Sequence, residues 1–291
     1  MELYDNIKQG ERGAWVSIGA YLLLSVLKIG IGYWTKSEAL TADGINNTSD
    51  IVVSLAVLIG LKISRKPPDR NHPYGHMRAE TIASMIASFL MMAAGLQVLL
   101  QAARGVLGGE APAPNPLAAL VALMSAVFMY GIYMYNRRLA EKINNHALLA
   151  AAADNRSDAF VSVGAAVGIA GAQFGWPWLD PVAAFAVGLV ICKTAWDIFY
   201  EASHTLTDGF DEDKLAVYRK TIGAVPGVRR IKDLRARAHG SVVLIDVVVE
   251  VSPELNVEQS HDISDAIERR MGEAHRIANV HVHIEPYTES T

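Results

Sequence analysis

Six long apolar stretches constrain the fold of this 291-residue chain more than any other feature. A helix needs about 20 consecutive, mainly apolar residues to cross the hydrocarbon core of a bilayer. The stretches that reach this length are residues 14–34, 38–63, 79–107, 116–136, 146–174 and 179–203. The sequence therefore predicts an α-helical membrane bundle of six transmembrane helices, because a helix satisfies its own backbone polar groups inside lipid.

Charged residues are scarce and unevenly distributed along the chain. They make up 19% of the sequence, whereas an average soluble protein has about 25%. We therefore expect two domains, a transmembrane domain over residues 1–207 and a soluble domain over residues 208–291. The net charge of −4 gives no indication of nucleic-acid binding, and the single cysteine, Cys192, excludes a disulfide framework.

The soluble domain shows the pattern α-β-β-α-β. Residues 211–224 and 257–272 have helical periodicity, whereas residues 230–238, 242–251 and 279–285 are strand-like. This order is typical of a small α+β domain in which helices cover one face of a sheet.

Basic residues indicate how the chain is oriented in the membrane, because lysine and arginine concentrate in cytoplasmic loops. The connector after the second span contains Lys62, Arg65, Lys66 and Arg70. The connector after the fourth span contains Arg137, Arg138 and Lys142. We therefore expect both connectors, both termini and the soluble domain to lie in the cytoplasm.

Two pairs of polar residues interrupt the apolar spans. Asn46 and Asp50 lie four residues apart in the second span, and Asp154 and Asp158 have the same spacing in the fifth. On a helix this spacing places both side chains of a pair on one face, one turn apart. Two helices that each present such a pair can enclose a cation with four oxygen ligands.

The energetic cost of these acids favours a bound metal ion. A carboxylate at the bilayer centre costs about 2.5–3.5 kcal/mol on insertion scales, and the nearby cations Lys28 and Arg156 are too few to neutralise them all. The alternative is that these side chains only hydrogen-bond the helices together. Asp43 is either a vestibule charge or a helix-start residue, and Lys28 either extends to the interface or pairs with a carboxylate.

Further candidate ligands lie outside the spans. Asp69, His72 and His76 fall within eight residues of the connector after the second span, and two histidines with a carboxylate are a plausible metal set. A polar loop held by hydrogen bonds is the alternative.

The soluble domain is also rich in histidine. His281 and His283 share a strand face there, and we expect the preceding helix, which carries His261, to cover that face and complete a metal site. Exposed histidines without a metal are the alternative.

Together, the six spans, the paired acids, the HPYGHMRAE loop and the α-β-β-α-β tail resemble the cation diffusion facilitators over essentially the whole chain. Members of this family are homodimeric metal/proton antiporters with a metallochaperone-like cytoplasmic domain. The resemblance implies efflux of a divalent transition-metal ion across the cell membrane by alternating access, with protons as counter-substrate. It also implies that residues 208–291 act in metal sensing and dimerisation.

The resemblance assigns roles to individual residues. It implies a transport site, a loop site and a reduced cytoplasmic-domain site in place of the binuclear zinc centre of zinc-carrying members, together with a charge pair at the dimer interface. The transport site is Asn46, Asp50, Asp154 and Asp158, and the loop site is Asp69, His72 and His76. The cytoplasmic-domain site is Asp246, His261, His283, His239 and Glu285. The charge pair is Arg78 and Asp208.

The transport set contains one asparagine, three aspartates and no histidine, whereas zinc-carrying members usually have a histidine there. Oxygen ligands suit harder ions such as Mn²⁺, and imidazole suits Zn²⁺. We therefore expect Mn²⁺ as the substrate, with Zn²⁺, Fe²⁺ and Co²⁺ left open, and no organic cofactor.

Other functional classes are less well supported. A metal-selective channel would use similar rings of acids but would show no proton coupling. A metal receptor would need only the soluble domain. The sequence lacks GxSxG and HExxH motifs, so we do not expect an enzyme.

Overall fold

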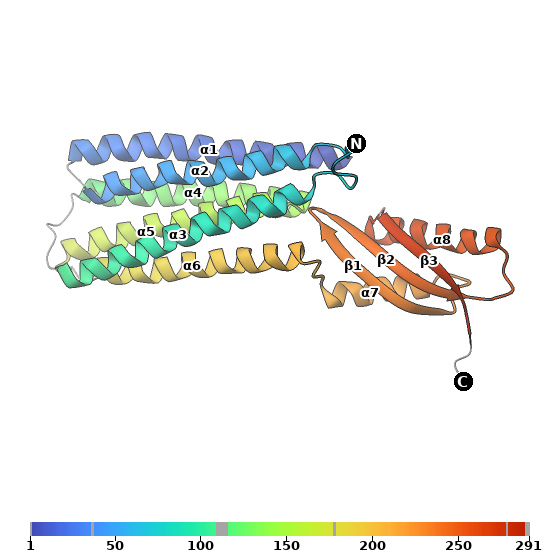
Figure 1. Ribbon diagram of the computed structural model, residues 1–291. Helices are drawn as coiled ribbons and strands as arrows, with labels where there is room; N and C mark the ends of the chain where they lie inside the picture. The colour runs from blue at the N-terminus through green and yellow to red at the C-terminus, as the bar shows by residue number, and fades with distance from the viewer. Residues whose placement is uncertain (1, 36–37, 109–115, 177–178, 278, 289–291) are drawn as a thin grey trace. The chain divides into compact units, whose positions relative to one another are not determined.

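The structure is a computed structural model that describes residues 2–35, 38–108, 116–176, 179–277 and 279–288 (Figure 1). The chain divides into two compact units, Met1–Ser203 and His204–Thr291. The first unit is a bundle of long helices, and the second combines a small sheet with two helices.

The six long helices coincide with the six predicted spans, which confirms the predicted bundle. Their bounds are α1 (Glu2–Thr35), α2 (Glu38–Ser64), α3 (Arg78–Gly108), α4 (Pro116–Ile143), α5 (His146–Gln173) and α6 (Leu179–Leu206). Within the described residues, Lys8–Trp34, Arg78–Arg104 and Pro116–Ile143 are by length and composition able to cross a membrane. The first helix begins well before the predicted span because the polar N-terminal segment continues it.

The bundle is apolar outside and polar inside. Large apolar side chains such as Leu100, Val127 and Trp34 are more than half exposed. Buried positions instead include Ser17, Asn136 and several other serines, asparagines and acids. Water-soluble monomers rarely expose apolar surface on this scale, so the arrangement is that of a helical bundle surrounded by lipid.

Four helices meet around the polar interior. Helix α1 packs against α2 and α4, while α5 contacts α1, α2, α3 and α4. The first two helices approach closely at Gly44, where a Cβ atom would lie 2.9 Å from the backbone nitrogen of Ile29. Side chains from α1, α2, α4 and α5 can therefore reach one shared interior.

The second unit has the predicted order α-β-β-α-β. Its elements are α7 (Glu212–Gly223), β1 (Arg230–His239), β2 (Val242–Val251), α8 (Val257–His275) and β3 (Asn279–Pro286). The strands form a sheet in the order β1-β2-β3, in which β1 and β2 are antiparallel and β2 and β3 are parallel. Helix α8 makes the crossover that a parallel pair requires.

One face of this sheet carries the core of the second unit. Ile222 from α7 and Ile267 and Met271 from α8 are fully buried against the sheet residues Ile245 and Val249. Both helices therefore cover the same face, as predicted. Asn256 begins α8 with a capping box, since its side chain accepts from the Gln259 amide and the Gln259 side chain accepts in return.

Candidate metal centres

Three aspartates from two helices lie together inside the bundle. Asp50 comes from α2, and Asp154 and Asp158 come from successive turns of α5; their exposed fractions are only 5%, 5% and 6%. One carboxylate oxygen of each lies within 4.8 Å of the others. Carboxylate oxygens bind hard divalent cations at about 2.0–2.6 Å, so one ion is able to contact all three residues.

Of the two asparagines predicted in the second span, the structure describes the side chain of Asn47. The side chain of Asn46, the fourth predicted ligand, lies outside the described residues, as does that of Asp43, so both assignments stay predictions. Asn47 is buried, and its Nδ2 donates to Asp50 Oδ2 at 3.2 Å. Within the described part of the chain, Asn47 Oδ1 is buried and has no hydrogen-bond partner. It is therefore a further oxygen next to the cluster.

A tyrosine from α1 joins two of the aspartates. The fully buried Tyr21 hydroxyl donates to Asp154 Oδ2 at 3.0 Å and also to Asp158 Oδ2. Asn155 Nδ2 in turn donates to the Tyr21 oxygen at 2.9 Å. Sequence reasoning missed this role for Tyr21 and Asn155. The available signal was the spacing of polar residues on α1, since Ser17 and Tyr21 are four residues apart within an apolar span.

The two candidate cations near the acids have different positions. Lys28 is fully buried, and its Nζ donates to Ser162 Oγ at 3.3 Å, one helical turn beyond Asp158. Lys28 is thus buried rather than extended to the interface, and its pairing with a carboxylate stays a prediction. Arg156 instead donates to Thr194 on α6 at 3.3 Å. Three clustered carboxylates with one lysine nearby make an interior that favours a divalent cation.

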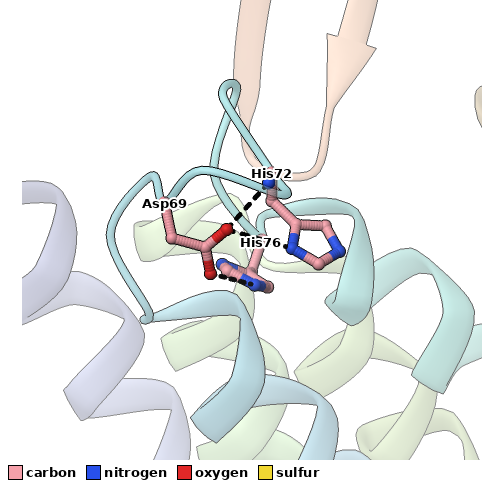
Figure 2. A group of neighbouring side chains, drawn as sticks. All are labelled: Asp69, His72 and His76. Atoms are coloured by element: carbon pink, nitrogen blue, oxygen red, sulfur yellow. Dashed lines mark hydrogen bonds and ion pairs between the residues drawn. The ribbon is translucent and has the colours of Figure 1, made fainter.

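The connector between α2 and α3 brings its three predicted ligands together (Figure 2). Asp69 Oδ1 lies 3.3 Å from His72 Nδ1, and Asp69 Oδ2 lies 3.5 Å from His76 Nε2. The two imidazole rings are 4.2 Å apart between centroids. One donor atom from each residue lies within 4.8 Å of the others, so the geometry fits a single ion.

Local backbone contacts hold this loop in place. The amides of Asn71 and His72 donate to Asp69 Oδ1 at 2.9 and 2.8 Å, a turn that aspartate commonly forms. The hydrogen bond from the His72 amide is the main reason why the pKa of Asp69 is lowered from its ordinary value. The carboxylate is therefore charged at neutral pH and available to a cation. Within the described residues, His76 Nδ1 is buried without a hydrogen-bond partner.

The candidate ligands of the second unit are not gathered into one site. Asp246 on β2 lies opposite His281 on β3, with 3.9 Å between carboxylate and imidazole. His261 lies on α8 beside Asp265 at 3.6 Å. Among the described residues, the groups of three or more ligands are confined to the bundle interior and the α2–α3 loop. The cytoplasmic-domain site thus stays a prediction.

Sheet geometry explains why these residues are dispersed. Val280, Val282 and Ile284 pack toward the core with α8, so His283 lies on the opposite face of β3. The expectation that the helix carrying His261 covers the histidine face is wrong for this reason.

Glu285 and His239 are also placed apart from a metal group. Glu285 is 2.5 Å from Lys232 Nζ and 3.8 Å from His283 Nε2. The lysine holds the pKa of Glu285 below its ordinary value, and so already supplies the positive charge that a metal would bring. His239 lies at the end of β1. Arg78 begins α3 and Asp208 follows α6, and their pairing between protomers stays a prediction.

A lipid-facing bundle that encloses three aspartates defines a membrane transporter for cations. Two family models match the chain: the cation efflux transmembrane domain over residues 14–207, and the cytoplasmic domain of cation efflux proteins over residues 210–287. The chain belongs to the cation efflux family, the cation diffusion facilitators.

Relatives in Bacillus subtilis (strain 168) are similar along the whole chain. The manganese efflux system protein MneS is 59% identical over 98% of this chain and 99% of its own length. The uncharacterized transporter YdbO is 54% identical over the same shares of the two chains. The manganese efflux system protein MneP is 32% identical over 95% of this chain and 96% of its own length.

Proposed function

We propose that this protein exports Mn²⁺ from the cytoplasm in exchange for protons. The observation that carries the proposal is the buried cluster of Asp50, Asp154 and Asp158, whose ligand atoms are all oxygens. Oxygen donors suit Mn²⁺ better than the softer ions that prefer imidazole or thiolate. Two relatives similar along the whole chain carry manganese efflux in their names.

Protons and the metal compete for the same carboxylate oxygens. Metal ligands must be deprotonated, so protonation of Asp50, Asp154 or Asp158 weakens ion binding. In the proposed cycle the ion enters from the cytoplasm, the bundle opens to the outside, and protons replace the ion. The protonated site then returns to the cytoplasmic side, where the carboxyl groups lose their protons. Asn46 is the proposed fourth ligand.

Efflux of Zn²⁺, Fe²⁺ or Co²⁺ by the same cycle is the second candidate. The loop residues Asp69, His72 and His76 favour it, because two imidazoles beside a carboxylate suit these ions and lie within reach of one ion. In the proposed arrangement this loop gathers ions at the cytoplasmic end, and the buried cluster selects among them.

We also propose a homodimer in the plasma membrane with both termini in the cytoplasm. The basic residues of the α2–α3 and α4–α5 connectors support this orientation. Residues 208–291 form the proposed metal-sensing and dimerisation domain, and Arg78 and Asp208 form the proposed charge pair between protomers. A dimer that weakens in Arg78→Asp and recovers in Arg78→Asp with Asp208→Arg, measured by light scattering in detergent, would support this pair.

Transport into proteoliposomes tests the proposed function. Vesicles that contain the wild type should accumulate Mn²⁺, and an imposed pH gradient should change the rate. Asp50→Asn should abolish uptake because it removes a charged ligand. Asn46→His should raise Zn²⁺ uptake relative to Mn²⁺. The matched control is Asp197→Asn, which alters an exposed aspartate on α6 paired with Lys193 and should leave uptake unchanged.

Three results would contradict the proposal. Wild-type uptake of Zn²⁺ in clear preference to Mn²⁺ would refute the ligand argument while leaving the site in place. A rate indifferent to the pH gradient, together with ion conductance, would indicate a channel. Full uptake by Asp50→Asn would show that the ion binds elsewhere.

A further inference from the structure

A buried hydrogen-bond network from α1 and α4 ends on the transport aspartates. Asn136 on α4 donates from Nδ2 to Ser17 Oγ at 2.7 Å and to Asn155 Oδ1 at 3.0 Å. Ser17 Oγ also donates to Asn155 Oδ1 at 3.0 Å. The chain continues through Asn155 to Tyr21 and from there to Asp154 and Asp158. The four network residues are 0% exposed.

The direction of the hydrogen bonds fixes where the phenol proton goes. Asn155 Oδ1 accepts from both Ser17 and Asn136, so its Nδ2 is the end that faces Tyr21. The Tyr21 oxygen accepts that bond, and a phenol has one proton to donate. That proton is therefore directed at the carboxylates. Tyr21 on α1, supported by Asn136 on α4, therefore presents a hydrogen-bond donor to the transport site. Neither helix supplies a predicted metal ligand.

The hydroxyl of Tyr21 contacts one oxygen of each of two predicted metal ligands. Tyr21 directs its one proton at Oδ2 of Asp154 and Oδ2 of Asp158, which share it. The shared bond restricts how both carboxylates turn and leaves the other oxygen of each without this donor. Groups that hydrogen-bond to metal ligands orient them, and their loss typically lowers metal affinity 10–100-fold. The phenol does this without adding a positive charge, so the site keeps its attraction for a dication.

We propose that Tyr21 is a positioning residue that sets the metal affinity of the transport site, and that Asn155 orients its hydroxyl. This inference rests on the proposed function of Asp154 and Asp158. The competing interpretation is that the network only joins α1, α4 and α5, as hydrogen bonds between transmembrane helices do elsewhere. If Tyr21 positions the ligands, loss of its hydroxyl lowers ion affinity. If the network only joins the helices, the loss lowers the amount of folded protein.

Tyr21→Phe is the decisive variant because it removes the hydroxyl and keeps the ring. We expect the half-saturating Mn²⁺ concentration for proteoliposome uptake to rise about tenfold or more, at an unchanged amount of folded protein. Ser25→Ala is the matched control. It removes a buried hydroxyl one turn further along α1, where Ser25 bonds Thr48 on α2 at 2.7 Å, and should leave half-saturation as in the wild type.

A second variant tests whether Tyr21 and Asn155 act as one unit. Asn155→Ala should also raise the half-saturating concentration, and Tyr21→Phe with Asn155→Ala should raise it no further than the larger single effect. If the increases in the half-saturating concentration from the two substitutions multiply in the double variant, Asn155 does not act through Tyr21. Half-saturation in Tyr21→Phe equal to or below that of the wild type would overturn the role of Tyr21.

Asp158→Asn distinguishes failure of this inference from failure of the proposed function. If Asp158→Asn abolishes uptake while Tyr21→Phe behaves as the wild type, the site stands and Tyr21 is merely structural. If Asp158→Asn transports Mn²⁺ normally, the site itself is wrong. Isothermal titration of Mn²⁺ into the purified full chain provides the same comparison without transport, because a loss of folded protein lowers the stoichiometry rather than the affinity.

Discussion

Asn145 connects the first turns of α3 and α5, and its replacement should lower the stability of the fold without changing its affinity for the ion. Its Oδ1 accepts from the Leu148 amide at 2.9 Å, so it is the N-cap of α5. Its Nδ2 donates at 2.5 Å to Glu80, a fully buried acid in the first turn of α3. Asn145→Ala removes both bonds at once.

The expected cost is the sum of two contributions. Loss of an N-cap costs about 0.5–2 kcal/mol, and loss of a hydrogen bond to a charged group about 1.5–3 kcal/mol. Asn145→Ala should therefore lower the free energy of unfolding by about 2–5 kcal/mol. Because the aspartates of α5 begin two turns further on, at Asp154, the half-saturating Mn²⁺ concentration of the folded fraction should stay unchanged.

The assay is unfolding of the detergent-purified chain by titration with a denaturing detergent, followed by tryptophan fluorescence. Asn145→Asp keeps the cap acceptor but sets a second carboxylate against Glu80, so its stability should recover as the pH is lowered. Glu141→Gln, at an exposed pair with Arg137, is the control and should cost at most about 1 kcal/mol. A cost below that of the control in Asn145→Ala would refute the reasoning.

Two further predictions concern the regions outside the membrane. The hydrogen bond from the His72 amide lowers the pKa of Asp69, so this amide should stay protected from hydrogen exchange from neutral pH down to about pH 4. The protection should be lost as the pH falls through the lowered pKa. In Asp69→Ala it should be absent at every pH. Lys232→Ala should raise the pKa of Glu285 toward its ordinary value, as seen by NMR titration of the carboxyl carbon. It should change the free energy of unfolding little, because the pair is partly exposed.

The fold could be predicted because its dominant signals are local. Twenty or so apolar residues in succession have few alternatives to a membrane helix, and the strand alternation of residues 279–285 reflects a sheet with one covered face. The i, i+4 spacing of Asp154 and Asp158 likewise fixed their shared face before any tertiary contact was known. Such patterns depend only on the periodicity of a single element.

The remaining features depend on contacts between elements distant in the sequence. Tyr21 and Asn155 are 134 residues apart. The spacing of Ser17 and Tyr21 marks a polar face on α1, but it does not show which residue of another helix that face meets. The same limit applies to His261 and His283. Strand alternation placed His281 and His283 on one face, but which face α8 would cover depended on the sheet order and the crossover.

Two acid sites among the described residues show opposite ways of compensating a carboxylate. In the second unit, Lys232 neutralises Glu285 with a full positive charge, which removes the reason for a cation to bind there. In the bundle, the neutral hydroxyl of Tyr21 donates toward Asp154 and Asp158, which by our proposal orients them and leaves their charge in place. A transport site must bind its ion and also release it, so neutral donors suit it better than fixed cations: they leave the negative charge for the ion and the protons to share in turn.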